Sequence, residues 1–195
     1  MCELVIVVDV QADFMRGQGA LPVPGAEALI GPLNRWLAGL SPERTAGVLF
    51  TFDTHDAQTY PDSAEAKLFP PHCLKGTPGW ALVADPAAAD RAIPRHRLEK
   101  GVFDMWAEPG LLVEPVDATG ASPVEREAFF ADLRAEGVGR VVVVGVAADY
   151  CVRWAVEGLL ARGFEVEVPA ALTRGIERDM AAVAVELRSD RLAVA

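Results

Sequence analysis

The chain has 195 residues, of which 51% are hydrophobic and 24% charged, and its formal net charge is −10 at pH 7. This length and composition predict one domain, residues 1–195, with a substantial core, and exclude a disordered chain. The acidic charge argues against nucleic acid as a partner, because such a surface normally needs a basic patch. No apolar stretch approaches the length of a membrane span, so no membrane partner is expected.

The cysteine pattern and the first residues indicate a cytoplasmic protein. Cys2, Cys73 and Cys151 are odd in number and widely spaced, which is not the pattern of a disulfide framework. The first apolar run follows no basic leader and is too short for a signal peptide. We therefore expect reduced thiols and a cytoplasmic location.

The first half of the chain predicts two buried strands, one helix and a long functional loop. Residues 4–9 form a β-branched run that ends in an acid, and residues 48–52 form a second such run before Asp53. Residues 25–40 carry apolar side chains at helical spacing, although Pro32 favours a later start for the helix. Residues 54–80 are rich in Pro, His and Gly and are too long for an idle loop.

The second half alternates predicted strands and helices. We expect strands at 97–100, 141–144, 164–168 and 192–195 (the last at a sheet edge), and helices at 123–136, capped by Ser122, 149–162, ended by Gly163, and 179–188. This alternation predicts an α/β fold, a three-layer α/β/α sandwich with a mostly parallel central sheet of about six strands.

Four polar residues follow the predicted strands. Asp9, Asp53, Lys100 and Cys151 each come after an apolar run, and parallel strands gather their carboxyl ends at one edge, where ligands bind. Singly, each is explained by a chain that emerges into water. Together they form a chemical set, because an acid can take the proton of a thiol and a lysine can stabilise the thiolate. The start of a helix at Cys151 also favours a lowered thiol pKa.

The long loop contains a candidate metal site. Asp53 and His55 point to the same side of an extended segment, and Glu65 and His72 follow in the same loop. Two histidines with carboxylates suit one divalent ion, Zn²⁺, Fe²⁺ or Mn²⁺, with positions open for water or substrate. Cys73 is expected to be structural, because neighbouring residues rarely both reach one metal.

Aromatic residues lie close in sequence to these polar groups. Most aromatic residues belong to a core, and at least one of this set is expected to do so, yet a planar substrate needs such walls. The set comprises Phe14, Phe69, Phe103 and Trp106.

Taken together, these motifs resemble the isochorismatase-like cysteine hydrolases, in particular the nicotinamidase/pyrazinamidase branch. The matching segments occur in the family's order and span nearly the whole chain: VDVQADF (8–14), DTH (53–55), EAKLFPPHCLKGTPG (65–79), EKG (99–101) and GVAADYCV (145–152). The resemblance implies a metal-dependent amidase that hydrolyses nicotinamide and pyrazinamide-like amides to the acid and ammonia through a thioester. It also suggests a homo-oligomer.

The resemblance further implies a role for each matching residue. Cys151 would be the nucleophile, Asp9 its base and Lys100 the cation beside the thiolate. A cis peptide would fall at Val146–Ala147 and would aim backbone N–H groups at an oxyanion. The resemblance assigns the metal ligands to Asp53, His55, Glu65 and His72, and the walls around the pyridine ring to Phe14 and Phe69.

Two departures from the family pattern affect the expected substrate. Lys100 is followed by GVFDMW (101–106), in which Phe103 replaces a tyrosine and Trp106 a phenylalanine, and Ala148 replaces a threonine. The triad and ligands are unchanged, so the chemistry is expected to survive. The alternatives are an amidase for another small carboxamide or carbamoyl compound, and a non-catalytic metal-binding protein of the same fold. A nucleotide-binding domain and a thiol redox protein are disfavoured, because the chain lacks a Gly-rich turn after its first strand and a Cys-x-x-Cys pair.

Overall fold

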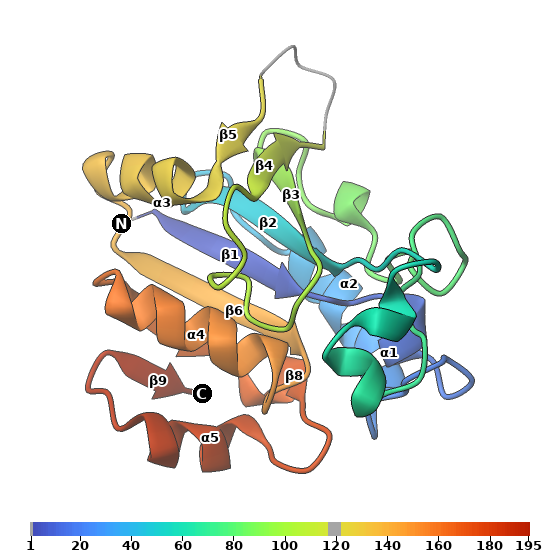
Figure 1. Cartoon of the computed structure of the whole chain (residues 1–195). Helices are drawn as coiled ribbons and strands as arrows, with labels where there is room; N and C mark the ends of the chain where they lie inside the picture. The colour runs from blue at the N-terminus through green and yellow to red at the C-terminus, as the bar shows by residue number, and fades with distance from the viewer. Residues whose placement is uncertain (1, 117–121) are drawn as a thin grey trace.

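The computed structural model describes residues 2–116 and 122–195, and these residues form a single sheet with helices packed on both of its faces (Figure 1). The strand order is β5-β4-β3-β2-β1-β6-β7-β9, and β8 pairs with β6. The strands are β1 (Glu3–Val8), β2 (Thr45–Asp53), β3 (Arg95–Lys100), β4 (Leu112–Pro115), β5 (Val124–Glu125), β6 (Arg140–Val146), β7 (Glu165–Val168), β8 (Thr173–Arg174) and β9 (Leu192–Val194).

The central strands are parallel and buried on both faces. β1 pairs with β2 on one side, with Val5 opposite Val48, and with β6 on the other, with Val5 opposite Val142. Side chains alternate along a strand, so Leu4 and Ile6 join one hydrophobic cluster while Val5 joins the cluster on the opposite face. The continuous apolar run of β1 is therefore the signature of a strand covered twice, as predicted.

The helices divide between the two clusters. They are α1 (Ala12–Met15), α2 (Ile30–Ala38), α3 (Arg126–Ala135), α4 (Cys151–Ala161) and α5 (Met180–Leu187). Residues of α1, α2 and the 3₁₀ turn Ala26–Leu29 pack into one cluster, and residues of α3, α4 and α5 pack into the other. This arrangement confirms the three-layer α/β/α prediction.

The sheet has more strands than the expected six, because nine are present in the described residues. The additional strands are β4, β5 and β8, of which β5 and β8 have only two residues each. β4 runs antiparallel to β3 and β5 antiparallel to β4, so this end of the sheet departs from the parallel pattern. None of the three forms a continuous apolar run, and their pairing depends on the assembled sheet.

Two helix starts also differ from the expectation. α3 begins at Arg126, and the Glu125 carboxylate, not Ser122, accepts the N–H groups of Glu127 and Ala128. α2 begins at Ile30, before Pro32, which lies in the first turn where its missing N–H costs no helical hydrogen bond. No helix in the described ranges is long and apolar enough to cross a membrane.

Candidate active site and metal cluster

The carboxyl ends of β3, β2, β1 and β6 lie side by side and carry the four polar residues of the predicted set. Asp9 directly follows β1, Asp53 ends β2 opposite Lys100 at the end of β3, and Cys151 begins α4 shortly after β6. In Figure 1, β1 ends at the right, where the chain between β2 and β3 folds over this edge. The prediction that these residues meet at one edge follows directly from the parallel strand order.

Lys100 is the centre of this group. Its Nζ lies 2.8 Å from Asp9 Oδ2, 3.5 Å from Asp53 Oδ1 and 3.4 Å from Cys151 Sγ. All four residues are buried, with Lys100 only 2% exposed. Burying a charge is costly unless it is paired, so the two carboxylates around this ammonium are what allow it to lie there.

The electrostatics of the group keep the lysine charged and the thiol neutral. Burial acts to lower the pKa of Lys100, but Asp9, Cys151 and Asp53 outweigh it and hold the pKa well above its usual value. Burial raises the pKa of the Cys151 thiol; Lys100 lowers it, and Asp9 and Asp53 raise it again, so the net pKa is well above normal. The expectation of a lowered thiol pKa at this helix start is therefore wrong for the ligand-free protein. The thiol needs a base.

One neighbouring side chain orients the Asp9 carboxylate, and another holds the backbone of Asp53. Thr51 Oγ1 donates to Asp9 Oδ1 at 2.5 Å and accepts the Asp9 backbone N–H at 3.1 Å. Gln11 donates to the Asp53 carbonyl at 2.8 Å and accepts the Asp53 N–H at 2.8 Å. Asp9 Oδ2 has no hydrogen bond of good geometry and is left facing the lysine.

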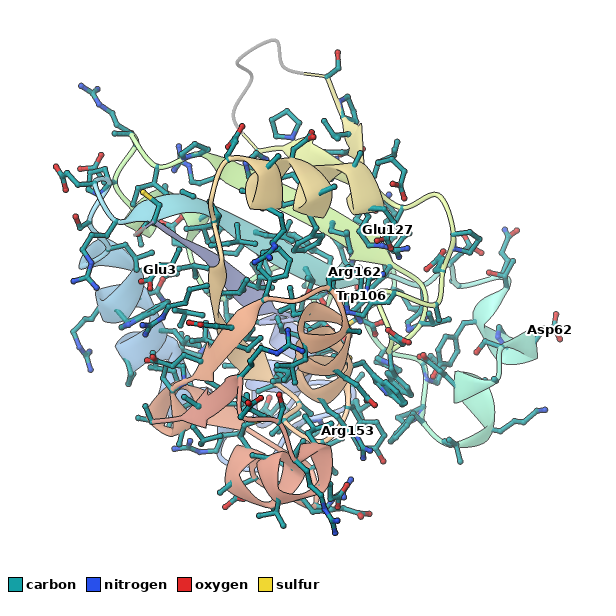
Figure 2. All side chains as sticks on the ribbon, turned by 90° about the vertical axis from the view of Figure 1, so that its left-hand side faces the viewer. Glu3, Asp62, Trp106, Glu127, Arg153 and Arg162 are labelled. Atoms are coloured by element: carbon teal, nitrogen blue, oxygen red, sulfur yellow. The ribbon has the colours of Figure 1, made fainter. Side chains whose placement is uncertain are left out.

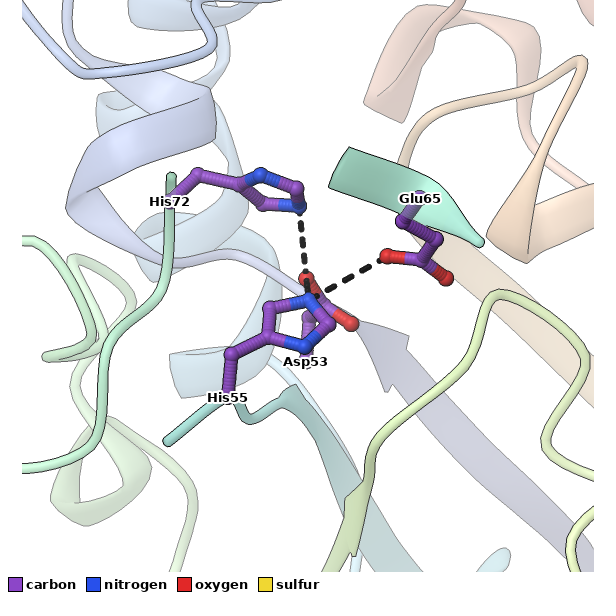
Figure 3. Close-up of side chains that lie close together, drawn as sticks. All are labelled: Asp53, His55, Glu65 and His72. Atoms are coloured by element: carbon purple, nitrogen blue, oxygen red, sulfur yellow. Dashed lines mark hydrogen bonds and ion pairs between the residues drawn. The ribbon is translucent and has the colours of Figure 1, made fainter. Parts of the chain in front are cut away.

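The long loop brings together the four predicted metal ligands (Figure 3). His55 Nε2 lies 3.0 Å from Asp53 Oδ2 and 3.2 Å from Glu65 Oε2, and His72 Nε2 lies 3.1 Å from Asp53 Oδ2. One ligand atom from each residue lies within 4.8 Å of the others, and all four residues are buried.

The donor atoms of this cluster fit a divalent ion. His72 Nε2 and Glu65 Oε2 are buried and, among the described residues, have no hydrogen bond of good geometry, although both point into the cluster. The other nitrogen of the His72 ring, Nδ1, lies 2.8 Å from the Pro70 carbonyl, so Nε2 faces inward. Two imidazoles and two carboxylates are a donor set that Zn²⁺, Fe²⁺ and Mn²⁺ accept.

The charges in the cluster are strongly coupled. Burial acts to raise the pKa of Asp53, but Lys100, His55 and His72 overcome it and hold the pKa well below its usual value. Burial acts to lower the pKa of His55, and the Asp53 and Glu65 carboxylates overcome it and raise the pKa to about 9. A proton on His55 therefore balances part of the negative charge in the ligand-free protein.

An apolar pocket lies next to the Cys151 sulfur. It is lined by Phe14, Leu21, Val23, Phe69, Phe103, Ala147, Tyr150, Cys151 and Ile176. The Phe103 ring stands 5.6 Å from Phe69 and 5.4 Å from Tyr150, both nearly edge to face, and Phe14 stands 5.4 Å from the His72 ring. The pocket thus borders the thiol directly and reaches the metal cluster through its Phe14 wall.

Three of the four predicted aromatic walls line this pocket, but Trp106 does not. The Trp106 indole N–H donates to the Trp154 and Ala155 carbonyls of α4, at 3.1 and 3.3 Å, and its ring packs on Phe130 at 4.9 Å. Figure 2 shows Trp106 beside Arg162 and Glu127 at this helix. Sequence proximity to Phe103 suggested a wall, whereas the indole turns away and packs against the helix.

Four pocket residues escaped the sequence analysis: Leu21, Val23, Tyr150 and Ile176. Three of them are aliphatic residues in loops, with no pattern that separates them from core residues. Tyr150 was detectable, because it directly precedes Cys151 and therefore lies at the same helix start.

The backbone around Cys151 has the predicted form. The Val146–Ala147 peptide is cis, and Ala147 lines the pocket next to Cys151. Cys151 is the first residue of α4, where backbone N–H groups have no acceptor within the helix.

Cys73 is outside the metal cluster and fully buried. Burial raises the pKa of its thiol, and its backbone N–H donates to Asp13 Oδ2 at 2.8 Å.

The chain belongs to the isochorismatase domain family, whose sequence profile matches residues 3–195. Together with the assembled site, this membership defines the class of protein as a hydrolase that acts on amide carbon–nitrogen bonds.

The chain is similar in sequence and in structure to proteins named nicotinamidase or pyrazinamidase. The chain is 32% identical over 185 residues to the nicotinamidase/pyrazinamidase of Mycobacterium tuberculosis, covering 93% of this chain and 91% of the relative. It is 28% identical to the nicotinamidase of Escherichia coli, covering 88% and 83%. Among solved structures, the pyrazinamidase of Pyrococcus horikoshii in complex with zinc is 29% identical, with a TM-score of 0.71 over 99% of this chain and 98% of that one.

Proposed function

We propose that the protein hydrolyses nicotinamide, and close pyridine or pyrazine carboxamides, to the acid and ammonia, with one divalent metal ion bound by the four-residue cluster. The observation that carries the proposal is the position of the apolar pocket. Cys151 lines this pocket, and Phe14, another of its wall residues, stands 5.4 Å from the His72 ring, so a flat ring bound there would lie against the thiol and close to the metal cluster. The relatives named nicotinamidase and pyrazinamidase support the choice of substrate.

The first step is attack by Cys151 on the carboxamide carbon. Asp9 takes the thiol proton as the carbon–sulfur bond forms, and the carbonyl oxygen becomes an oxyanion. We assign the N–H groups of Ala147, a residue of the pocket wall, and of Cys151, the first residue of α4, as the donors to this oxygen. Lys100 stays charged and offsets the negative charge that builds up between sulfur and carboxylate.

The second step removes ammonia and the third releases the acid. Asp9 gives its proton to the departing nitrogen, the carbon–nitrogen bond breaks, and a thioester on Cys151 remains. A water molecule then attacks the thioester carbon and loses a proton to Asp9, and the proton returns to the sulfur as the acid leaves. A single carboxylate therefore serves twice, which matches its fixed orientation by Thr51.

The metal ion would be held by Asp53, His55, Glu65 and His72. When bound, it supplies a Lewis acid that polarises water or holds a ring nitrogen of the substrate. The histidines present neutral Nε2 atoms to it only after His55 has lost its proton, so binding is expected to release a proton from the cluster.

One observation favours a second candidate, an amidase for another small carboxamide. Every side chain that lines the pocket apart from Tyr150 and Cys151 is apolar, and Phe103 stands where the family usually places a tyrosine. A pocket with few polar groups selects by shape more than by hydrogen bonding. The metal cluster beside the pocket favours the pyridine amide over a substrate without a ring nitrogen.

The deciding experiment is ammonia release from nicotinamide by the purified protein, with and without added Zn²⁺, Fe²⁺ or Mn²⁺. We expect Cys151→Ala to abolish turnover and to keep the wild-type metal content and fold, because the sulfur lies outside the metal cluster. His55→Ala should instead lose metal and raise KM for pyridine amides. Full activity in Cys151→Ala would refute the mechanism, and no release by folded, metal-loaded protein would refute the substrate.

A further inference from the structure

The segment 101–111, between β3 and β4, contacts three parts of the site at once. It begins directly after Lys100, it contains Phe103 of the pocket wall, and it contains Trp106, which packs on the helix that Cys151 begins. Lys100 is fixed by the sheet, whereas residues 101–110 pair with no strand in the part of the chain that the structure describes. Side-chain contacts therefore make a large contribution to the position of this segment.

The Trp106 indole packs against α4 at Gly158, where any residue with a Cβ would clash with it. A Cβ on Gly158 would stand 2.0 Å from Trp106 Nε1 and 2.1 Å from its Cδ1, which no real structure tolerates. The indole N–H donates to two α4 carbonyls, and the Arg162 guanidinium covers the ring at 3.7 Å from its centroid. Arg162 is itself held by Glu127 of α3, at 2.8 and 2.6 Å (Figure 2). The tryptophan is thus enclosed by two helices.

The backbone around Trp106 is held by side-chain hydrogen bonds. The buried Arg126 donates to the carbonyls of Met105 and Glu108, and the Met105 side chain is only 1% exposed. The Glu108 carboxylate turns back and accepts the N–H of Gly101 at 2.8 Å. These hydrogen bonds tie the segment together, and the Trp106 indole is the side chain that hydrogen-bonds it to α4.

Segment 101–111 also orients Glu65, one of the four residues of the metal cluster. The Phe103 backbone N–H donates to Glu65 Oε1 at 3.1 Å, and the other oxygen of that carboxylate, Oε2, points into the metal cluster. Groups that hydrogen-bond to metal ligands fix the direction of the ligand atoms and contribute to metal affinity. The same residue places its ring against Phe69 and Tyr150 in the pocket.

We propose that Trp106, seated on Gly158, is a positioning residue that holds Glu65 in the metal cluster and Phe103 in the pocket wall. Gly158 lies seven residues after Cys151, about two turns along α4. The contact therefore ties the segment that orients Glu65 to the helix that begins at the nucleophile. The effect on KM and kcat for nicotinamide rests on the proposed function, whereas the effect on the affinity for Zn²⁺ does not.

The test is Gly158→Ala, measured as Zn²⁺ affinity by competition with a chelator and as KM and kcat for nicotinamide. The new methyl group must displace the indole, while alanine is intrinsically better than glycine within a helix, so the fold is expected to survive. We expect the Kd for Zn²⁺ to rise about tenfold, at the low end of what loss of a ligand-orienting contact costs. KM should rise by a similar factor, with kcat reduced less, because the Cys151, Asp9 and Lys100 group is untouched.

Two further variants make the result specific. Gly31→Ala introduces the same methyl group in α2, where it meets only the flexible end of Arg35 at 3.3 Å, and should leave both quantities unchanged. Trp106→Leu removes the indole and should weaken Zn²⁺ binding as Gly158→Ala does. In the Trp106→Leu background, adding Gly158→Ala should change nothing further, because the group it displaces is already gone.

The inference is overturned if folded Gly158→Ala binds Zn²⁺ and nicotinamide as the wild type does, or if its effect persists in full in the Trp106→Leu background. It is also overturned if the wild-type protein binds no Zn²⁺. If the wild-type protein binds Zn²⁺ but releases no ammonia from nicotinamide, the proposed function fails, and the Zn²⁺ affinities alone decide the role of Trp106.

Discussion

Asp9 shows how one side chain can be prepared to accept a proton twice and to donate it twice. Thr51 holds one of its carboxylate oxygens, and the other faces Lys100, so the carboxylate cannot rotate away from the thiol. The same negative charge that makes Asp9 a base also opposes ionisation of Cys151. Burial and this charge together keep the sulfur protonated, and Asp9 can take the proton when a substrate is present to accept the attack.

This arrangement predicts an unusual phenotype for Asp9→Asn. Removing the negative charge removes one of the influences that raise the pKa of the Cys151 thiol, so the pKa should fall. Alkylation of Cys151 by iodoacetamide, followed by peptide mass spectrometry, should then reach half its maximum at a lower pH than in the wild type. Turnover should nevertheless be lost, because no base remains.

Cys2 provides the internal control, because it is exposed and lies outside the site. Its alkylation profile should be the same in both proteins. An unchanged or higher midpoint for Cys151 in Asp9→Asn would contradict the assigned electrostatics.

At the scale of secondary structure, the sequence predicts what depends on local pattern. The strands β1, β2 and β6 are continuous apolar runs, and their order places Asp9, Asp53 and Cys151 at one edge without further information. β4, β5 and β8 are short, and only the assembled sheet makes them strands.

The site follows the same division. Residues at strand ends or in the histidine-rich loop were predictable, since their chemistry stands out against apolar surroundings. Ile176 and Val23 were not, because an aliphatic residue in a loop looks the same whether it lines a pocket or fills a core. Trp106 was assigned by proximity in the sequence, and only the orientation of its ring shows that it packs on α4.

The loop after β8 carries Ile176 and is held by one carboxylate, which gives a prediction for Asp149→Asn. Asp149 accepts the N–H of Ile176 at 2.9 Å on Oδ1, and those of Glu177 and Arg178 at 2.8 and 3.0 Å on Oδ2. An amide group cannot accept at its nitrogen, so with its oxygen turned toward Glu177 and Arg178 the bond to Ile176 loses its acceptor and an N–H group faces an NH₂ group. We expect a loss of about 2 kcal/mol in the free energy of unfolding in urea, with a raised KM because Ile176 is released.

Glu177→Gln makes the same charge change on an exposed side chain of that loop. It should leave both the unfolding free energy and KM close to wild type. Equal effects of the two substitutions would show that charge, and not the three hydrogen bonds, accounts for the result.

At the scale of the whole molecule, the metal cluster should make stability depend on pH. His55 has a raised pKa of about 9 in the folded, metal-free protein, against an ordinary value of 6.5 for histidine. Its contribution to stability is therefore fully present below pH 6.5 and is lost as the pH rises through about 9. We expect the metal-free protein to lose up to roughly 3 kcal/mol of unfolding free energy over this interval, from the size of the shift.

Zn²⁺ should largely abolish this loss, because the ion replaces the proton on His55 and stabilises the folded state by binding to it. The pKa values of the Cys73 and Cys151 thiols are raised, so these groups change the unfolding free energy only at higher pH. The pKa of Asp53 is lowered, so this group changes the unfolding free energy only in acid. Urea unfolding at pH 6 to 9, with chelator or with Zn²⁺, measures the difference. If the metal-free His55→Gln variant lost the same unfolding free energy between pH 6 and 9, the loss would have to come from a group other than His55.

The position of β1 at the centre of the sheet also constrains how the protein is made. β1 leaves the ribosome before the other strands of the sheet, but its partner β6 begins only at Arg140, so for most of this synthesis one edge of a strand that is apolar from Leu4 to Val8 has no neighbour. Such an edge pairs readily with other chains, and folding must wait for the last third of the sequence. Nascent or truncated chains of this protein are therefore expected to depend on chaperones, and slower synthesis at lower temperature should increase the yield of folded enzyme.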